Sequence, residues 1–257
     1  MRYLSAAHTD VGTTKRVNQD AFCLKIAKTK KMSIAFAVLC DGMGGLENGE
    51  LASAFLVNAF SAWFETELPP LVAEGKPDLN RITSRWNDIV QEQGRKIMNF
   101  GRARGVSMGT TLTAFLAVDN AYAYIQVGDS RLYKLTTGIE QVTKDQTLVA
   151  YEMEQNRLTA EEARADTRRN ILLQCVGASN AIAPETGTGI IRENDVFLLC
   201  SDGFRHEVQE PEMFGVLAPA VLTSEQIMKK ALVDLVELNK SRNERDNITA
   251  LVVKAIQ

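Results

Sequence analysis

Four aspartates lie at the ends of apolar, strand-like runs in this sequence, and they are its best candidates for chemistry. Asp41, Asp129 and Asp202 each follow such a run, and Asp246 comes just before another. If the strands share a sheet, we expect the four carboxylates to gather at one end of it, where they repel one another unless cations neutralise them. Hard divalent ions such as Mg²⁺ and Mn²⁺ take oxygen ligands of this kind. The sequence therefore predicts a metal centre built from carboxylates.

Hydrophobic periodicity predicts the elements that must position these residues. The expected strands are 2–9, 20–26, 32–40, 110–118, 121–128, 131–136, 139–143, 195–200 and 248–254. The expected helices are 47–67, which Pro69-Pro70 should end, 79–100, 145–166 and 224–239. Short polar connectors between the four runs from 110 to 143 are typical of antiparallel hairpins. With no repeat or linker in the sequence, we expect one domain over 1–257 in which helices cover two β-sheets.

Composition excludes several classes of protein. The chain of 257 residues is 45% hydrophobic and 24% charged, which is typical of a soluble globular protein. A net charge of -3 argues against a nucleic-acid partner. No apolar run approaches the roughly 20 residues that span a bilayer, and the N-terminus lacks the apolar core of a signal peptide. The four cysteines form no Cys-x-x-Cys pair, so we expect a protein of the reducing cytoplasm with no membrane contact.

Eight short segments, in their order along the chain, resemble motifs of the metal-dependent protein phosphatases of the PP2C (PPM) family. They are Thr9-Asp10-Val11-Gly12 with Asn18-Gln19-Asp20, Asp41-Gly42-Met43-Gly44-Gly45, Met108-Gly109-Thr110-Thr111, Val127-Gly128-Asp129-Ser130-Arg131, Thr143-Lys144-Asp145-Gln146, Arg169-Asn170-Ile171-Leu172, Cys200-Ser201-Asp202-Gly203 and Asp246-Asn247-Ile248-Thr249. Each segment alone is a weak signal, whereas the ordered set across almost the whole chain is specific. The resemblance implies an α+β fold, a four-layer α-β-β-α sandwich of two antiparallel β-sheets flanked by helices.

The same resemblance implies roles for the acidic residues. Asp41 should bridge two metal ions, and the Gly42 carbonyl should bind one of them. Asp202 and Asp246 should complete the site of the other ion.

Three further features follow from the family pattern. Asp129 resembles the additional ligand that many bacterial members use, together with Asp202, for a third and weaker ion. Asp20 resembles the carboxylate that orients metal-bound waters. The segment 146–168 resembles the flap beside the active site.

The sequence departs from the family pattern near the first motif. Many members bind substrate phosphate with an arginine five residues before the aspartate of that motif, but here the position is Lys15, with Arg16 next to it. A lysine offers a point charge rather than a bidentate fork, so either Lys15 binds phosphate with weaker geometry or Arg16 reaches in, and we favour Lys15. Gln19 replaces a common glutamate, and Met43 stands where eukaryotic members often have a histidine acid. A thioether cannot donate a proton, so a water must do so.

Carboxylates and divalent ions suit phosphomonoester hydrolysis. Paired ions lower the pKa of a bridging water and hold it in line with phosphorus, and phosphoryl transfer requires no protein nucleophile. The sequence has no Cys-x₅-Arg motif, and two histidines, His8 and His206, are too few for a histidine-rich metallophosphatase. We therefore expect hydrolysis of phosphoserine and phosphothreonine in proteins with two, or with Asp129 three, Mn²⁺ or Mg²⁺ ions.

Other interpretations of single residues remain open. Asp129 followed by serine is also a good turn pair that could cap a hairpin. Gly42-Met43-Gly44-Gly45 resembles a phosphate-binding loop but lacks its Lys-Ser/Thr ending. Thr110 and Thr111 are expected to support the site from a strand, and neither His8 nor His206 is assigned a role.

The expected partners are phosphoproteins that a bacterial serine/threonine kinase has modified for signal transduction, and the enzyme should be a monomer. The rival hypothesis is a pseudophosphatase that binds a partner without turnover. Loss of two of Asp41, Asp202 and Asp246 would favour that rival, and none is lost. A third hypothesis is an enzyme of a sigma-factor partner-switching pathway, but such phosphatases usually carry a sensor domain, for which the chain has no room.

Overall fold

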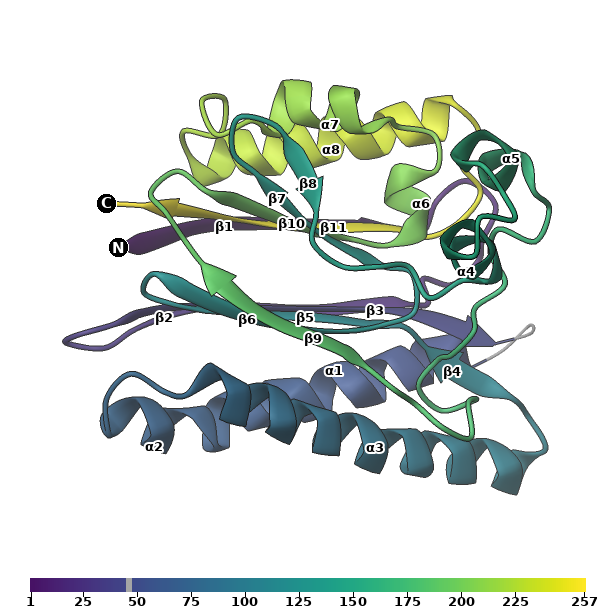
Figure 1. The fold of residues 1–257 in the computed structure, drawn as a ribbon, viewed down its shortest axis with the longest axis horizontal. Helices are drawn as coiled ribbons and strands as arrows, with labels where there is room; N and C mark the ends of the chain where they lie inside the picture. The colour runs from purple at the N-terminus through teal and green to yellow at the C-terminus, as the bar shows by residue number, and fades with distance from the viewer. Residues whose placement is uncertain (45–47) are drawn as a thin grey trace.

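Two antiparallel β-sheets lie face to face in the computed structural model, which describes residues 1–44 and 48–257 (Figure 1). The first sheet contains β1 (Arg2–Asp10), β11 (Ile248–Ile256), β10 (Val196–Cys200), β7 (Arg131–Leu135) and β8 (Ile139–Gln141), in that order. The second sheet contains β2 (Asp20–Lys28), β3 (Ser33–Gly44), β5 (Leu112–Val118), β6 (Ala121–Val127) and β9 (Glu185–Ile190), and β4 (Met108–Thr110) pairs with β3. Each sheet therefore joins strands that are far apart in the sequence.

Helices cover the outer face of each sheet (Figure 1). The second sheet is covered by α1 (Gly49–Thr66), α2 (Leu68–Ala73) and α3 (Leu79–Arg104), and the first by α7 (Glu210–Leu217) and α8 (Glu225–Ser241). Two short helices, α4 (Leu148–Glu154) and α5 (Ala160–Ala165), lie at one end of the sandwich, near α6 (Asp202–Arg205). These four layers confirm the predicted α-β-β-α sandwich. No helix in the described parts of the chain is both long enough and apolar enough to cross a membrane.

The helices form where the sequence combines a capping residue with an apolar stripe. The side chain of Asp78 accepts a hydrogen bond from the backbone N–H of Asn80 at the start of α3, and Ser224 caps α8 in the same way through Ile227. In α3, Trp86 faces the second sheet and meets Trp63 of α1 edge to face at a centroid distance of 5.2 Å. This packing is the reason that α1 and α3 appear with nearly the bounds predicted for them, 47–67 and 79–100.

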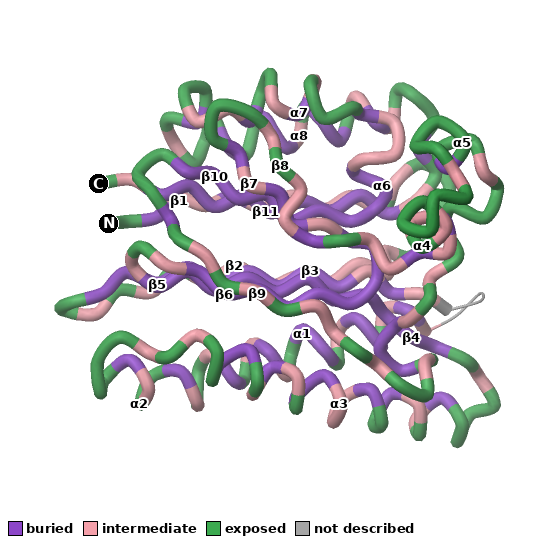
Figure 2. Tube along the Cα trace, viewed as in Figure 1, coloured by how far each residue is buried: buried purple, intermediate pink, exposed green. Residues whose placement is uncertain are grey.

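The interior between the sheets changes from apolar to polar along the strands. Ala37 and Leu39 of β3 point into the apolar interior, whereas alternate residues face the helices, as the period of two for a strand requires. The next β3 residue on the same face is Asp41. In β2 the inner face likewise runs from Phe22 to Asp20, which is paired directly with Asp41. The strands thus deliver acidic groups to one end of the layer between the sheets, whose central strands are buried along most of their length (Figure 2).

The structure corrects three details of the prediction. The four aspartates do not belong to one sheet, because β3 and β6 lie in the second sheet and β10 and β11 in the first. The connector 128–130 does not close a hairpin but carries the chain from the second sheet to the first, so a hairpin cap does not explain Asp129. The helix expected over 145–166 is two short helices, α4 and α5. Gly45 of the glycine-rich motif and residue 47 of the first predicted helix lie outside the described residues.

Four elements were missed by the sequence prediction. They are α2, α6, α7 and β9. β9 reads Glu-Thr-Gly-Thr-Gly-Ile and lacks the apolar alternation that marks a strand, so its place in the sheet comes from pairing with β6. Pro69 and Pro70 end α1 as predicted, but they also occupy the first turn of α2, where a missing N–H costs nothing.

Candidate metal centre

An acidic cavity of about 330 Å³ lies where the polar ends of both sheets meet. Asp41 and Asp129 reach it from the second sheet, and Asp202 and Asp246 reach it from the first. The remaining lining residues are Lys15, Gln19, Gly42, Met43, Thr111, Asn170 and Leu172. All four predicted aspartates are therefore brought together, although they come from opposite layers of the sandwich.

The backbone around Asp41 is held by hydrogen bonds to its neighbours. The N–H of Asp41 donates to the hydroxyl of Thr111 at 2.9 Å, and its carbonyl accepts from the hydroxyl of Thr110 at 3.0 Å. Thr111 also shares a hydrogen bond with Ser130 at 2.8 Å, one residue from Asp129. Both hydroxyls hold the Asp41 backbone as expected, but only Thr110 lies in a strand, β4, whereas Thr111 lies between β4 and β5. Their hydroxyls fix the backbone of two of the acidic segments relative to each other.

Gly42 is required by a close approach of three segments. A Cβ at this position would lie 2.2 Å from the carbonyl oxygen of Gly49 and 2.5 Å from that of Gln19, closer than atoms can approach. The Gly42 N–H donates to the Gln19 carbonyl at 3.1 Å. Any larger residue would push α1 or the 11–19 loop away from the cavity, so the glycine after Asp41 has a steric reason.

Asp20 lies beside Asp41 with both carboxylate oxygens buried and without a hydrogen-bond partner among the described residues. One oxygen of Asp202, Oδ1, is in the same state. Buried polar atoms are almost always hydrogen-bonded, and leaving them unpaired costs free energy. These oxygens are therefore suited to bind a hard cation or to accept hydrogen bonds from the water around it.

Electrostatics support the same conclusion. Burial, the largest influence, and repulsion from Asp202 and Asp246 raise the pKa of Asp20 to about 7, although the neighbouring hydroxyls of Thr249 and Ser201 lower it. Burial and the charges of its acidic neighbours, Asp20 first, raise the pKa of Asp41 well above its usual range. Burial and mutual repulsion both oppose the ionised form of these carboxyl groups, and bound cations would relieve the repulsion.

Lys15 supplies one positive charge within the cavity. Its Nζ lies 2.8 Å from Oδ1 of Asp246. Burial by itself would lower the pKa of Lys15, but the hydrogen bond to Asp246 and the charges of Asp41 and Asp202 raise it. Arg16, the alternative phosphate ligand, is exposed and does not line the cavity. The structure thus places Lys15, and not its neighbour, at the site.

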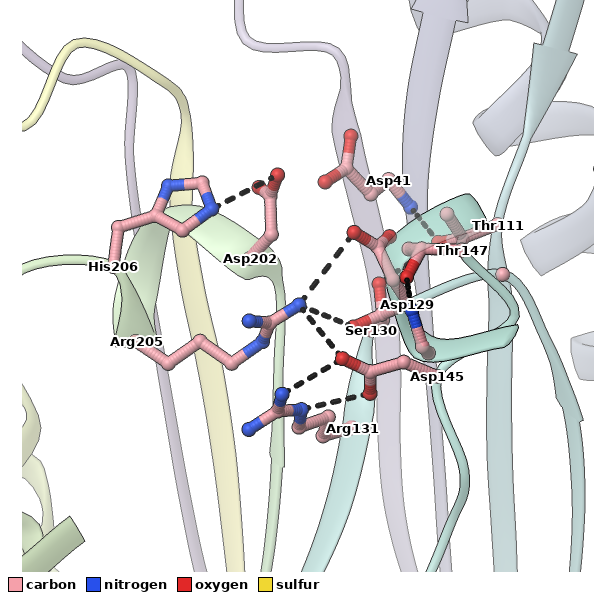
Figure 3. A network of polar contacts seen from close by, with 12 residues as sticks. Asp41, Thr111, Asp129, Ser130, Arg131, Asp145, Thr147, Asp202, Arg205 and His206 are labelled. Carbon is pink, nitrogen blue, oxygen red and sulfur yellow. Dashed lines mark hydrogen bonds and ion pairs between the residues drawn. The ribbon is translucent and has the colours of Figure 1, made fainter. Parts of the chain in front are cut away.

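Two basic residues missed by the sequence prediction face the acidic group from α6 and its end (Figure 3). Nη2 of Arg205 lies 2.9 Å from the carbonyl oxygen of Asp129 and 3.5 Å from its carboxylate. His206 lies 3.4 Å from Asp202 through Nε2 and 3.2 Å from Glu244 through Nδ1. The sequence did contain a signal for both residues. Arg205 and His206 follow Asp202 by three and four positions, and residues at that spacing on a helix share a face.

Within the described residues, no group of three or more acidic, histidine or cysteine side chains is arranged to hold a metal ion. Mg²⁺ does not need three such ligands, since it usually keeps several waters and takes one or two carboxylates. The carboxylates, the Gly42 carbonyl and the open volume between them suit ions that stay largely hydrated.

Comparisons with known proteins agree with this geometry. The sequence model described as protein phosphatase 2C matches residues 8–237. The serine/threonine phosphatase stp of Listeria innocua is 32% identical over 250 residues, which cover 96% of this chain and 93% of that protein. The S. agalactiae serine/threonine phosphatase has a TM-score of 0.84 at 28% identity, with 99% of this chain and 100% of that one covered.

A further solved structure carries metal. The catalytic domain of the phosphatase PstP in complex with two manganese ions has a TM-score of 0.77 at 26% identity, and 99% of each chain is covered. The chain therefore belongs to the protein phosphatase 2C family, and its fold and acidic cavity define a protein serine/threonine phosphatase.

Proposed function

We propose that this protein, as one catalytic domain over 1–257, hydrolyses phosphoserine and phosphothreonine in other proteins with a water activated by Mn²⁺ or Mg²⁺. The observation that carries the proposal is the convergence of Asp41 from one sheet with Asp202 and Asp246 from the other around one cavity. The manganese ions in the related PstP structure support the choice of metal.

The residues have the following roles in this proposal. Asp41 and the Gly42 carbonyl would hold one ion, and Asp202 and Asp246, with Asp41 shared between both ions, would hold the other after their side chains draw together, since as they lie they do not form such a group. Bound ions supply charge neutralisation and an activated water for attack on phosphorus. Asp20, whose buried oxygens have no partner among the described residues, accepts hydrogen bonds from water and so orients it.

Lys15 binds the substrate phosphate. Its ammonium group lies 2.8 Å from Oδ1 of Asp246. With Asp246 engaged by a cation, the ammonium group would be available for another anion. The ammonium is then a charge at the mouth of the cavity that attracts the dianionic phosphate of the substrate.

Asp129 and Asp202 form a third and weaker site. Asp129 lies at the crossover between the sheets, next to the cavity, and is 5% exposed. Burial and the charge of Asp202 raise its pKa to about 7 although Arg205 lowers it. A third ion would relieve this repulsion.

The biological setting follows from the family. The related phosphatases come from bacteria, so the substrates are proteins phosphorylated by a bacterial serine/threonine kinase, and the role is signal transduction. Free thiols at all four cysteines suit the cytoplasm. A monomer suffices for this site, because every residue with a proposed role comes from one chain.

Metal removal and replacement test the proposal. Protein stripped with EDTA should not hydrolyse para-nitrophenyl phosphate, and Mn²⁺ or Mg²⁺ should restore the activity. With metal, phosphoserine and phosphothreonine peptides should be hydrolysed and matched phosphotyrosine peptides should be poor substrates. Full activity in the stripped protein would overturn the metal mechanism, and binding of phosphopeptides without turnover would favour the pseudophosphatase.

A further inference from the structure

Four charged side chains form a continuous chain of contacts beside the metal cavity (Figure 3). Arg131 holds Asp145 with two hydrogen bonds, from Nε at 2.8 Å and from Nη2 at 2.7 Å. Arg205 lies 3.6 Å from the same Asp145 carboxylate and 3.5 Å from the carboxylate of Asp129. Of these four residues, only Asp129 also lines the metal cavity. This series of contacts therefore connects a proposed metal ligand to an internal arginine, Arg205.

Arg205 shares its charge between Asp145 and Asp129, whose carboxylates lie 3.6 and 3.5 Å from its Nη2. Asp145 is already engaged by the bidentate pair with Arg131, which is the stronger geometry. Arg205 donates instead to the Asp129 carbonyl at 2.9 Å, and its own Nε is buried without a partner among the described residues. Its side chain is only 13% exposed, so water compensates little of its charge.

The positive charge of Arg205 cannot be removed by deprotonation. A guanidinium stays protonated at every physiological pH, unlike a histidine or a buried lysine. Any cation that binds the Asp129 carboxylate must therefore share it with a permanent positive charge a few ångströms away, and the two cations repel each other. The local geometry opposes the same ion that the acidic residues attract.

We infer that Arg205 is a built-in counter-ion that competes with a metal ion for Asp129 and thereby keeps the third site weak. This inference rests on the proposed function, because it assumes that Asp129 is a metal ligand. It assigns a positioning role to a residue outside the motifs that the sequence shares with the family. The consequence is an enzyme whose third ion is recruited only when the metal concentration is high, while the two other ions bind without hindrance from Arg205.

Metal binding to stripped protein tests this inference without relying on activity. Mn²⁺ titrations of the wild type, followed by calorimetry and by the electron paramagnetic resonance signal of free Mn²⁺, should show two tight steps and one weak step. Arg205→Gln should tighten the weak step by at least about tenfold and leave the tight steps unchanged, because a charge-assisted contact is of the size that changes a binding constant by that factor. An unchanged or weakened third step in a folded Arg205→Gln protein would overturn the inference.

The double variant separates competition from a structural role. In an Asp129→Asn background, where the ligand is absent, Arg205→Gln should change metal binding less than twofold. A full effect in that background would show that Arg205 acts through the fold and not through Asp129. Arg85→Gln is the matched control, since Arg85 also holds a carboxylate, Glu67, with two hydrogen bonds at 2.8 and 2.9 Å, but at the α1–α3 helix layer.

A measurement on the wild type keeps the inference testable if Arg205→Gln does not fold. Mg²⁺ is diamagnetic, so the guanidinium NMR signals of the arginines can be followed during its titration. The Arg205 signal, assigned by its loss in Arg205→Lys, should move with the weakest Mg²⁺ step, and a signal that moves only with the tight steps would contradict the competition. Wild-type protein that hydrolyses phosphopeptides with Mn²⁺ but shows neither effect would refute this inference alone, whereas absence of any metal-dependent hydrolysis would refute the proposed function.

Discussion

The interior between the two sheets is apolar along most of its length and acidic at one end, although the same strands line both parts. Phe197 of β10 and Phe115 of β5 meet across the apolar part with ring centroids 4.7 Å apart. Two residues beyond Leu39, on the same face of β3, the acidic part begins at Asp41. The apolar part is close-packed. The acidic part holds carboxylates that repel one another and buried oxygens that have no hydrogen-bond partner among the described residues.

The two parts contribute to the stability of the fold with opposite signs. Burial of apolar surface in the first part stabilises the fold. Burial of carboxylates in the second part opposes folding until cations bind, since each charged group loses its water. The apolar part therefore holds in place a site that is unfavourable by itself, as is common where a fold carries a functional site.

Truncation in the apolar part should cost the most stability. Phe197→Ala removes a fully buried ring that also contacts Tyr122 at a centroid distance of 5.0 Å, so the free energy of unfolding should fall by about 3–5 kcal/mol. Denaturant unfolding measures the loss, and kcat of the protein that remains folded should change less than about threefold. A tenfold loss of kcat in folded protein would show that the two parts are coupled. Phe197→Leu, a smaller truncation, should lie between the variant and the wild type.

Neutralising an aspartate of the acidic part should lower activity but raise the stability of the metal-free protein. Asp41→Asn should lower kcat at least about 100-fold, or about 2.7 kcal/mol of transition-state stabilisation. The same change should raise the unfolding temperature of the metal-free protein, because burial and the charges of Asp20, Asp202 and Asp129 oppose ionisation of this carboxyl, and an amide avoids that cost. Asp88→Asn, on the exposed face of α3, is the control and should change neither quantity. Lower stability of metal-free Asp41→Asn would contradict the view that this carboxylate opposes folding.

Lys15 should affect substrate binding more than chemistry. Lys15→Ala should raise KM for phosphopeptides about tenfold, which corresponds to about 1.4 kcal/mol, because the cavity loses its charge for phosphate. Lys15→Arg should keep or improve KM, since a fork can replace a point charge at a phosphate. Steady-state kinetics of Arg16→Ala supplies the matched comparison, and a larger effect there than for Lys15→Ala would show that Arg16 reaches the phosphate.

The pH dependence of stability should change sign when metal is added. Burial raises the pKa of Asp20 and Asp129 to about 7, above the value of about 4 for an unfolded aspartate. The folded protein therefore binds more protons than the unfolded chain between these values, and this contribution to stability is lost as the pH rises from about 4 to about 7. Metal ions bind the deprotonated carboxylates, so they should reverse the trend.

Thermal unfolding with and without Mn²⁺ measures this effect. The gain in unfolding temperature on adding Mn²⁺ should be larger at about pH 8 than at about pH 5, by roughly 2–4 °C for each kcal/mol of additional binding free energy. Using the gain, rather than the temperature itself, cancels the contributions of carboxylates far from the site. Equal gains at both pH values would mean that these groups are already ionised in the metal-free protein.

The local patterns of the sequence determined much of this protein. The mostly apolar run 32–40, typical of a strand buried on both faces, placed β3, and apolar spacing at Ile82, Trp86 and Ile89 placed α3, because each pattern reflects only the burial and period of the element itself. The positions of Asp41 and Asp202 at the ends of such runs were sufficient to nominate a metal centre. Ordered motifs along the chain pointed to the family that the comparisons then showed.

Only the tertiary structure decided which groups face one another. The sequence could not assign β3 and β10 to opposite sheets, since strand pairing depends on contacts between residues far apart in the chain. It also gave no reason to connect Arg205 with Asp129, 76 positions away, or Lys15 with Asp246. Charge pairing across that separation is a property of the packed sheets, because a Coulomb interaction depends on distance in space and on burial, and neither is encoded in local sequence.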